Sequence, residues 1–314
     1  MNSVRECARS ARLAHTFSVV GRDSRTGQMG VAVQSHWFSV GSVVTWAEAG
    51  VGAVATQALV EVSYGPLALD LMAGRKSSPQ ALAALLAADE GRALRQVAIV
   101  DSVGRVAAHT GERCIAYAGH ATGDGFSVQA NMMATADVWP AMADAYCGST
   151  GPLAERMLDA LDAGQAAGGD IRGQQSAAIL VVEAGSSGRR WADTVMELRV
   201  EDHPAPIQEL RRLVNLHRAY EHMNQGDDML GAGEVEAALQ EYGTAAQMAP
   251  EIEELRFWHA VALADLGRVE EALRILRAVF AVNQDWAALV QRLPPAGLLR
   301  DDSEMMARIL ALTQ

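Results

Sequence analysis

Residues 15–57 constrain the fold of this chain most, because they hold three apolar runs rich in β-branched residues and glycine. Side chains over residues 16–20 would alternate between the two faces of a β-strand, with Thr16, Ser18 and Val20 on one face and the apolar Phe17 and Val19 on the other. The same alternation returns over residues 30–35, after a polar turn at 23–27. The sequence therefore predicts a hairpin whose first strand begins with Thr16.

The rest of the first two thirds of the chain forms blocks of predicted strands and helices. Helices are expected at residues 67–73, 79–88, 135–146 and 152–163, and strands at 95–101, 105–110, 114–118, 126–131, 175–183 and 193–200. The predicted order is strands, two helices, strands, two helices and strands. This order fits an α+β fold with four layers, αββα, better than a strictly alternating βαβ sheet.

A repeat governs the C-terminal third. The phrase GEVEAAL at residues 233–239 recurs as GRVEEAL at residues 267–273, an offset of 34 residues. That period is the period of tetratricopeptide helix pairs. Pro204 and Pro206 mark the boundary before this region. We therefore predict an N-terminal extension (1–15), a sandwich domain (16–202) that folds without the rest, and an all-α tetratricopeptide-like domain (207–314).

Composition excludes several function classes. The formal net charge is −12, from 38 acidic and 26 basic residues, which argues against nucleic acid or a membrane surface as partner. Three scattered cysteines form neither a disulfide framework nor a zinc site. His217 and His222 are five residues apart, so a helix does not place them on one face as metal ligands. We expect a cytoplasmic protein without metal or cofactor.

Several longer phrases resemble one known family. The resemblance covers residues 16–202, and the family is the one catalogued as domain of unknown function 1028, placed among the N-terminal-nucleophile hydrolases. It rests on TFSVV (16–20), RD (22–23), GVAVQS (30–35), GVGAVATQ (50–57), SYGP (63–66), QAN (129–131) and GGDIRGQQSAA (168–178). The resemblance implies an αββα fold whose first strand begins with a catalytic Thr, Ser or Cys.

Thr16 is the candidate nucleophile that this resemblance implies. A free N-terminal threonine has its own base, because its α-amino group has a pKa of about 7.7–8.0 and can accept the hydroxyl proton. An internal threonine has only an amide nitrogen there. Thr16 is therefore inert in this chain unless the bond between His15 and Thr16 is cut or translation starts later. Without such a cut, Thr16 is simply the first residue of a strand.

The other candidate site residues come from the same phrases. Asn131 could donate to an oxyanion, as could the backbone of Gly50–Gly52 and Gly168–Gly169, although an asparagine also ends strands by bonding its own backbone. Asp170 and Arg172 could form an orienting ion pair, or merely a turn. With Thr16, Asn131 and Asp170 as catalytic residues, the predicted substrate-binding residues are Gln34, Ser35, His36, Gln57, Tyr64 and Arg172.

The sequence is compatible with two functions. The first is hydrolysis of a small amide or peptide by Thr16 after removal of residues 1–15. The second is a catalytically silent fold whose repeats bind a protein or peptide partner. Two repeats are fewer than an independent stack needs, so we also expect the apolar residues of the repeats to be covered by the sandwich domain or by a second copy of the chain, with self-association favoured. These apolar residues are Leu255, Phe257, Trp258, Val279, Phe280 and Trp286. The alternative is that residues 207–219 and 303–312 cap both ends of the repeats and leave nothing exposed.

Overall fold

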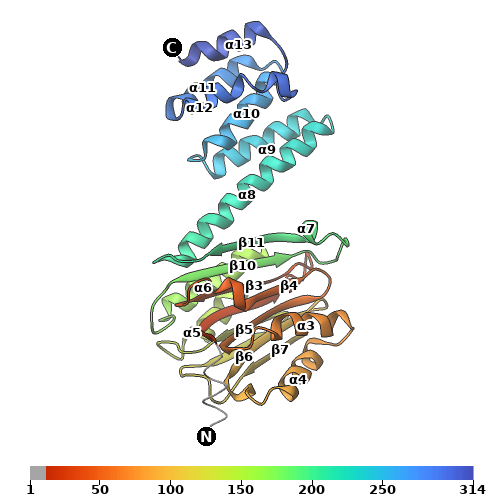
Figure 1. Cartoon of the computed structure of the whole chain (residues 1–314), viewed down its shortest axis with the longest axis vertical. Coiled ribbons are helices and arrows are strands. Elements are labelled where there is room, and N and C mark those ends of the chain that lie inside the picture. The colour runs from red at the N-terminus through yellow and green to blue at the C-terminus, as the bar shows by residue number, and fades with distance from the viewer. Residues whose placement is uncertain (1–11, 314) are drawn as a thin grey trace. The chain divides into compact units, whose positions relative to one another are not determined.

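The structure is a computed structural model that describes residues 12–313. The chain divides into two compact units, with the division between Arg212 and Leu213 (Figure 1). The first unit is mixed α/β and the second is helical. No helix among the described residues has both the length and the apolarity that a membrane span requires.

The first unit contains two antiparallel sheets. In one sheet, β5 lies between β6 on one edge and both β1 and β4 on the other, and β7 follows β6. The other sheet has the order β11-β10-β3-β2-β9-β8. The strands of the first sheet are β1 (Arg12–Ala14), β4 (Thr45–Glu48), β5 (Gly52–Val60), β6 (Arg95–Asp101) and β7 (Val106–Thr110); those of the second are β2 (Thr16–Arg22), β3 (Met29–Ser35), β8 (Gly119–Gly123), β9 (Phe126–Ala130), β10 (Ser176–Val182) and β11 (Thr194–Val200).

The predicted hairpin is formed by β2 and β3, in the middle of the second sheet. Its turn is held by Asp23 Oδ1, which accepts hydrogen bonds from the backbone of Arg25 and Thr26 at 2.7 and 3.2 Å. Gly27 completes the turn with a φ of 77°, a conformation that glycine adopts without strain. In this register Thr16 lies opposite Ser35, and each strand has one face toward the first sheet.

Apolar side chains on both faces of each sheet hold the first unit together. Between the sheets, Val20 and Val31 pack with Ala55 and Val100. On the outer face of the first sheet, helices α3 (Tyr64–Ala73) and α4 (Ser78–Ala88) cover Val54, Val97 and Ile99. Helices α5 (Val138–Gly148) and α6 (Leu153–Ala166) contact the second sheet, at β8 and β9 and at β2 and β3 respectively (Figure 1). Short helices α2 (Gly41–Val44) and α7 (Arg190–Asp193) connect strands.

Two local predictions differ from the structure. The strand predicted at 114–118 is absent, and the glycine-rich segment after it forms β8, which pairs with β9 as a hairpin. A β-carbon at Gly119 would lie 2.5 Å from Trp139 Cε2, so close packing against α5 requires the glycine there. In addition, β1 lies in the segment predicted to be an N-terminal extension; the residues before 12 lie outside the described part of the chain.

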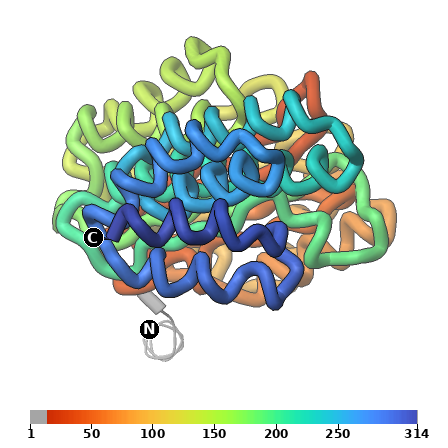
Figure 2. Tube along the Cα trace, turned by 90° about the horizontal axis from the view of Figure 1, so that it is seen from above, coloured from red at the N-terminus to blue at the C-terminus, as the bar shows by residue number. Residues whose placement is uncertain are grey.

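The second unit is built from helix pairs (Figure 2), and the segment between its last two helices also holds a short 3₁₀ turn at Pro294–Ala296. The positions that repeat at an offset of 34 are its core: Ala238 and Ala272 are both fully buried. Gly226 permits close packing, since a β-carbon there would lie 2.9 Å from the ring of Tyr242. The helices are α8 (Pro206–Gly231), α9 (Val235–Met248), α10 (Glu253–Asp265), α11 (Val269–Val282), α12 (Asp285–Val290) and α13 (Ser303–Leu310).

The apolar residues expected to need a partner are covered within this unit. Leu255, Phe257, Val279 and Phe280 are buried, and Trp258 and Trp286 pack against the same core. Part of the cover is Met305 and Ile309 of α13. This burial removes the observation from which we expected self-association.

The boundary between the units lies later than the prolines suggested. Ile207 and Leu210, in the first turns of α8, are buried. Arg211 of the same helix pairs with Asp159 and Asp162 of α6, at 2.8 and 2.6 Å. The first unit therefore includes the start of α8.

Candidate functional site

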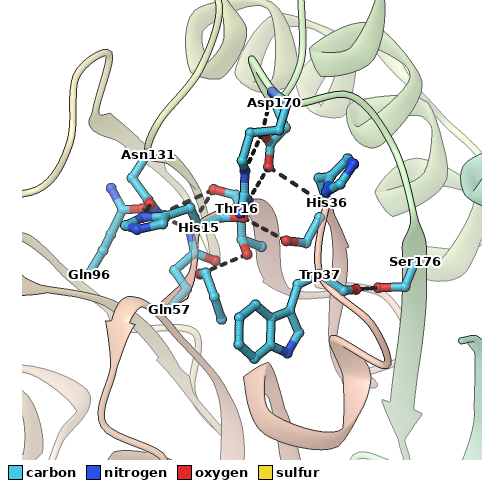
Figure 3. A network of polar contacts seen from close by, with 12 residues as sticks. His15, Thr16, His36, Trp37, Gln57, Gln96, Asn131, Asp170 and Ser176 are labelled. Carbon is cyan, nitrogen blue, oxygen red and sulfur yellow. Dashed lines mark hydrogen bonds and ion pairs between the residues drawn. The ribbon is translucent and has the colours of Figure 1, made fainter. Parts of the chain in front are cut away.

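Thr16 lies at the start of β2, fully buried, with neighbouring strands on both sides. Its hydroxyl donates a hydrogen bond to the backbone carbonyl of Ala14 at 2.8 Å. Thr16 and His15 lie in the middle of a network of polar side chains (Figure 3). The chain continues from Thr16 back through His15 into β1, which pairs with the end of β5. In this form the nitrogen of Thr16 is an amide and cannot serve as a base.

The carbonyl group that precedes Thr16 has two strong donors. The oxygen of His15 accepts from Ser35 Oγ at 2.6 Å and from Arg172 Nη2 at 2.8 Å. Arg172 is oriented by the buried carboxylate of Asp170, through bonds of 3.0 and 2.7 Å to its two oxygens. A cationic and a hydroxyl donor on one carbonyl oxygen polarise the bond between His15 and Thr16 and would stabilise negative charge on that oxygen.

The loop that carries Asp170 and Arg172 is shaped by glycine. Gly168, Gly169 and Gly173 have φ values of 126°, 59° and 106°, which are costly for other residues. Asp170 forms an antiparallel bridge with Met133, just beyond β9, and its Oδ2 accepts from the backbone of His36 at 3.3 Å. The loop, which leads from α6 to β10 along the chain, therefore contacts both the segment after β9 and the segment after β3.

The imidazole of His15 is buried beside Asn131. His15 Nδ1 lies 2.7 Å from Asn131 Oδ1, while Asn131 Nδ2 donates to the Thr16 carbonyl at 3.3 Å and to Gln96 Oε1 at 2.9 Å. These bonds orient the amide, so the proton on His15 belongs to Nδ1. Burial, above all, lowers the pKa of His15 and keeps the ring neutral. Both amide hydrogens of Asn131 are occupied, so its predicted role as oxyanion donor is not supported by this geometry.

Beyond Asn131, a network of neutral side chains fills the space between the sheets. Gln57 Nε2 donates to Gln96 Oε1 at 2.7 Å, and Gln96 Nε2 donates to Thr110 Oγ1 at 2.8 Å and to the Ala130 carbonyl at 2.9 Å. Ser18 and Gln129 continue the network. Buried polar groups linked in this way fix the position of Asn131 and thereby of His15.

Two residues next to this network have unusual backbone angles. Ala58 follows Gln57 with a φ of 71°, and Met132 follows Asn131 with a φ of 58°. Such left-handed conformations are unfavourable for residues with a β-carbon and tend to occur where the surrounding structure imposes them at functional sites. Ala58 is also the residue that pairs with Ala14 of β1.

Some predicted site residues lie elsewhere. Gln34 points to the opposite face of β3, and both its polar atoms lack a partner among the described residues. Tyr64 lies under the outer helices and donates to Asp89 at 2.9 Å. Gly50–Gly52 lies at the beginning of β5, whereas Gln57 of the site lies near the other end of that strand. The amides of Gly168 and Gly169 donate to carbonyls of α6 and are not free to bind a substrate oxygen. The structure thus brings together Thr16, Ser35, Gln57, Asn131, Asp170 and Arg172, with the backbone of His36.

Sequence reasoning missed His15 and Gln96. A polar residue inside the apolar run of β6 was a possible signal for Gln96, because a buried amide needs partners. Nothing local marks His15, whose importance comes from its carbonyl and its buried ring. Among residues 12–313, no group of three or more His, Cys, Asp or Glu side chains is arranged to hold a metal ion.

Comparison with known proteins agrees with this architecture. Residues 16–210 match the family of unknown function DUF1028, and residues 229–293 match the tetratricopeptide repeat. The match of the first unit covers more than half of the chain, which therefore belongs to the DUF1028 family. A crystal structure of a DUF1028 protein from Silicibacter pomeroyi is similar at 30% identity, with a TM-score of 0.58, over 64% of this chain and 88% of that one. No curated protein matches the chain.

Proposed function

We propose that the first unit is an amide or peptide hydrolase of the N-terminal-nucleophile kind, with Thr16 as nucleophile once residues 1–15 are removed. The observation that carries the proposal is the polarised carbonyl of His15, held by Ser35 and Arg172 directly before the threonine. The order of helix pair, sheet, sheet and helix pair supports the four-layer fold expected for such enzymes.

Thr16, Ser35 and Arg172 would also carry out the cleavage that removes residues 1–15. The hydroxyl oxygen of Thr16 attacks the His15 carbonyl carbon, the carbon–nitrogen bond breaks, and the hydroxyl proton ends on the released amine. Water then hydrolyses the resulting ester, which frees residues 1–15 with a new carboxylate and leaves Thr16 with a free amino group. During attack, Ser35 and Arg172 stabilise the charge that develops on the carbonyl oxygen.

After this step the site contains what hydrolysis requires. The amino group of Thr16 can accept its hydroxyl proton. Ser35 Oγ and Arg172 Nη2 no longer bond to His15 and can bind the carbonyl oxygen of a substrate. Asp170 acts through Arg172, because its two oxygens fix the direction of the guanidinium group.

Intact mass and N-terminal sequencing of the purified full chain test the proposal. We expect a product that begins at Thr16 and reacts with a threonine-directed electrophile. Ser35→Ala or Arg172→Gln should slow its appearance about a hundredfold, by analogy with loss of an oxyanion donor. Thr16→Ala should abolish cleavage and labelling and keep the fold.

Matched controls are Ser42→Ala and Arg199→Gln, which alter an exposed hydroxyl and an exposed guanidinium in the same unit. Both should cleave at the natural rate. A natural chain that keeps residues 1–15 under all conditions, and does not react with the electrophile, contradicts the proposal.

A second function, binding of a peptide by the helical unit, is favoured by one observation. A cavity of 330 Å³ is lined by Met223, Leu230 and Val261, with Asp227 and Asp265 also in its wall. Apolar walls beside carboxylates suit an amphipathic basic peptide. A peptide library displayed against the full chain should yield such sequences, and Val261→Glu should abolish their binding; recovery of acidic peptides would contradict this assignment.

A further inference from the structure

Residues 12–15 lie against the first unit in the way that a bound peptide would. β1 pairs antiparallel with the edge of β5 beyond β4, in the register Arg12 to Val60, Leu13 to Leu59 and Ala14 to Ala58. The side chain of His15 then enters a buried pocket, where only 3% of the residue is exposed. Its carbonyl ends between Ser35 and Arg172. An added strand, a filled pocket and a polarised carbonyl are the elements of peptide recognition by strand addition.

We propose that residues 12–15 occupy the subsites for the acyl side of the substrate. The edge of β5 receives an extended peptide, and the pocket of His15 receives a neutral planar side chain with one N–H donor. Histidyl peptides or amides are therefore the substrate class. This inference rests on the proposed function, because it assigns a substrate to the same Thr16.

The pocket selects by hydrogen bonding. The group that receives the His15 proton is Asn131 Oδ1, which can only accept, because Nδ2 of the same amide is bonded to the Thr16 carbonyl and to Gln96. A carboxylate in the pocket would face this oxygen without a proton to offer. An apolar side chain would leave the buried oxygen unpaired, which costs roughly tenfold or more in affinity.

The pocket also disfavours an occupant with a positive charge. Burial disfavours a positive charge on the ring of His15 most, and Arg172 disfavours it as well. The bond to Asn131 and the charge of Asp170 act in the opposite direction, but the pKa of His15 is still lowered. A lysine or arginine side chain would keep its charge and meet both penalties. The one polar contact of the His15 ring among the described residues is the bond from Nδ1 to Asn131, since Nε2 is buried without a partner there.

The edge of β5 explains why the occupant is extended. The left-handed Ala58, at the point where β1 and β5 meet, lies beside Gln57, and Gln57 Nε2 donates to the Thr16 carbonyl at 3.2 Å. The strand edge and the nucleophile are thus fixed to each other through one side chain. A peptide paired with β5 would place its last carbonyl at the two donors, as residues 12–15 do.

Rescue of an emptied pocket tests the inference in the full chain without any catalysis. All variants contain Thr16→Ala, so that no cleavage can occur. His15→Gly should melt at a lower temperature than its parent, and imidazole at about pH 8 should raise that temperature saturably. The parent should not respond. 1-Methylimidazole has a similar shape but no N–H donor, so it should not rescue.

Absence of rescue in a cooperatively melting His15→Gly protein, or equal rescue by 1-methylimidazole, overturns the assignment of the pocket. Neither result bears on cleavage before Thr16, which is measured separately by mass. Should His15→Gly not fold, His15→Asn and His15→Leu decide: the asparagine can donate to Asn131 Oδ1 and should melt closer to the parent. A leucine variant that equals or exceeds the asparagine variant also overturns the inference.

Discussion

The interior around Thr16 and the core of the helical unit are both buried, but they are held by different forces. Around Thr16, neutral amides and hydroxyls such as Gln57, Gln96 and Asn131 bond to one another across two sheets. In the helical unit, residues such as Ala272, Leu276 and Phe257 fill space without hydrogen bonds. The first interior depends on hydrogen bonds between its buried amides and hydroxyls, and the second depends on the volume that its side chains fill. A substitution should therefore do its damage by a different route in each.

The largest effect is expected from Phe257→Ala in the helical unit. The ring is fully buried, and its centre lies 4.7 Å from that of Trp286 and 5.2 Å from that of Trp258. Its removal should cost about 4 kcal/mol through lost burial and the cavity left behind. Hydrogen exchange followed by mass spectrometry reports each unit separately, and protection should fall in residues 213–313. Equal loss in the first unit would show that the two cores are not independent.

Gln96→Leu should have the next largest effect, in the first unit. Leucine has a similar volume, so little space is lost, but the carbonyl of Ala130 and the hydroxyl of Thr110 lose a donor. We expect a cost of about 3 kcal/mol, since each unpaired buried group costs about 1–3 kcal/mol. Hydrogen exchange should rise in β6, β7 and β9. The exposed Gln240→Leu is the matched control and should leave both units unchanged; an equally silent Gln96→Leu would mean that packing alone holds this interior.

The same contrast explains what the sequence could predict. The β2–β3 hairpin and the helix repeat follow from local periods of two and of 34 residues, and the structure confirms both. The pocket of His15 depends on pairing between β1 and β5, about 45 residues apart, and no local pattern specifies such a contact. Gln34 is a predicted site residue because it lies in the phrase GVAVQS, but alternation along β3 turns it to the face opposite Ser35. The β8 strand was missed because its stability comes from β9 and Trp139 and not from its own glycine-rich sequence.

The smallest expected effect is on the pH dependence of stability, which also differs between the two units. Burial lowers the pKa of His15 in the first unit and, as the main cause, also that of His259 in the second. A histidine whose pKa is lower in the folded state than its unfolded value near 6.5 stabilises the protein above that pH. This contribution is lost as the pH falls from about 6.5 toward the folded pKa, because the unfolded chain binds the proton first. The loss is at most about 1.4 kcal/mol per pH unit for each histidine.

In a chain that carries Thr16→Ala and therefore keeps residues 1–15, His15→Asn should flatten the dependence on pH in the first unit by about 1 kcal/mol between pH 7.5 and 5.5. His259→Asn should have a smaller effect, confined to the second unit, because that ring is partly exposed and water screens its charge. Hydrogen exchange at the two pH values, corrected for the intrinsic exchange rates, measures both. An unchanged slope in His15→Asn would mean that His15 takes up a proton in the folded protein, with its ring turned away from the neutral amide network that holds it here.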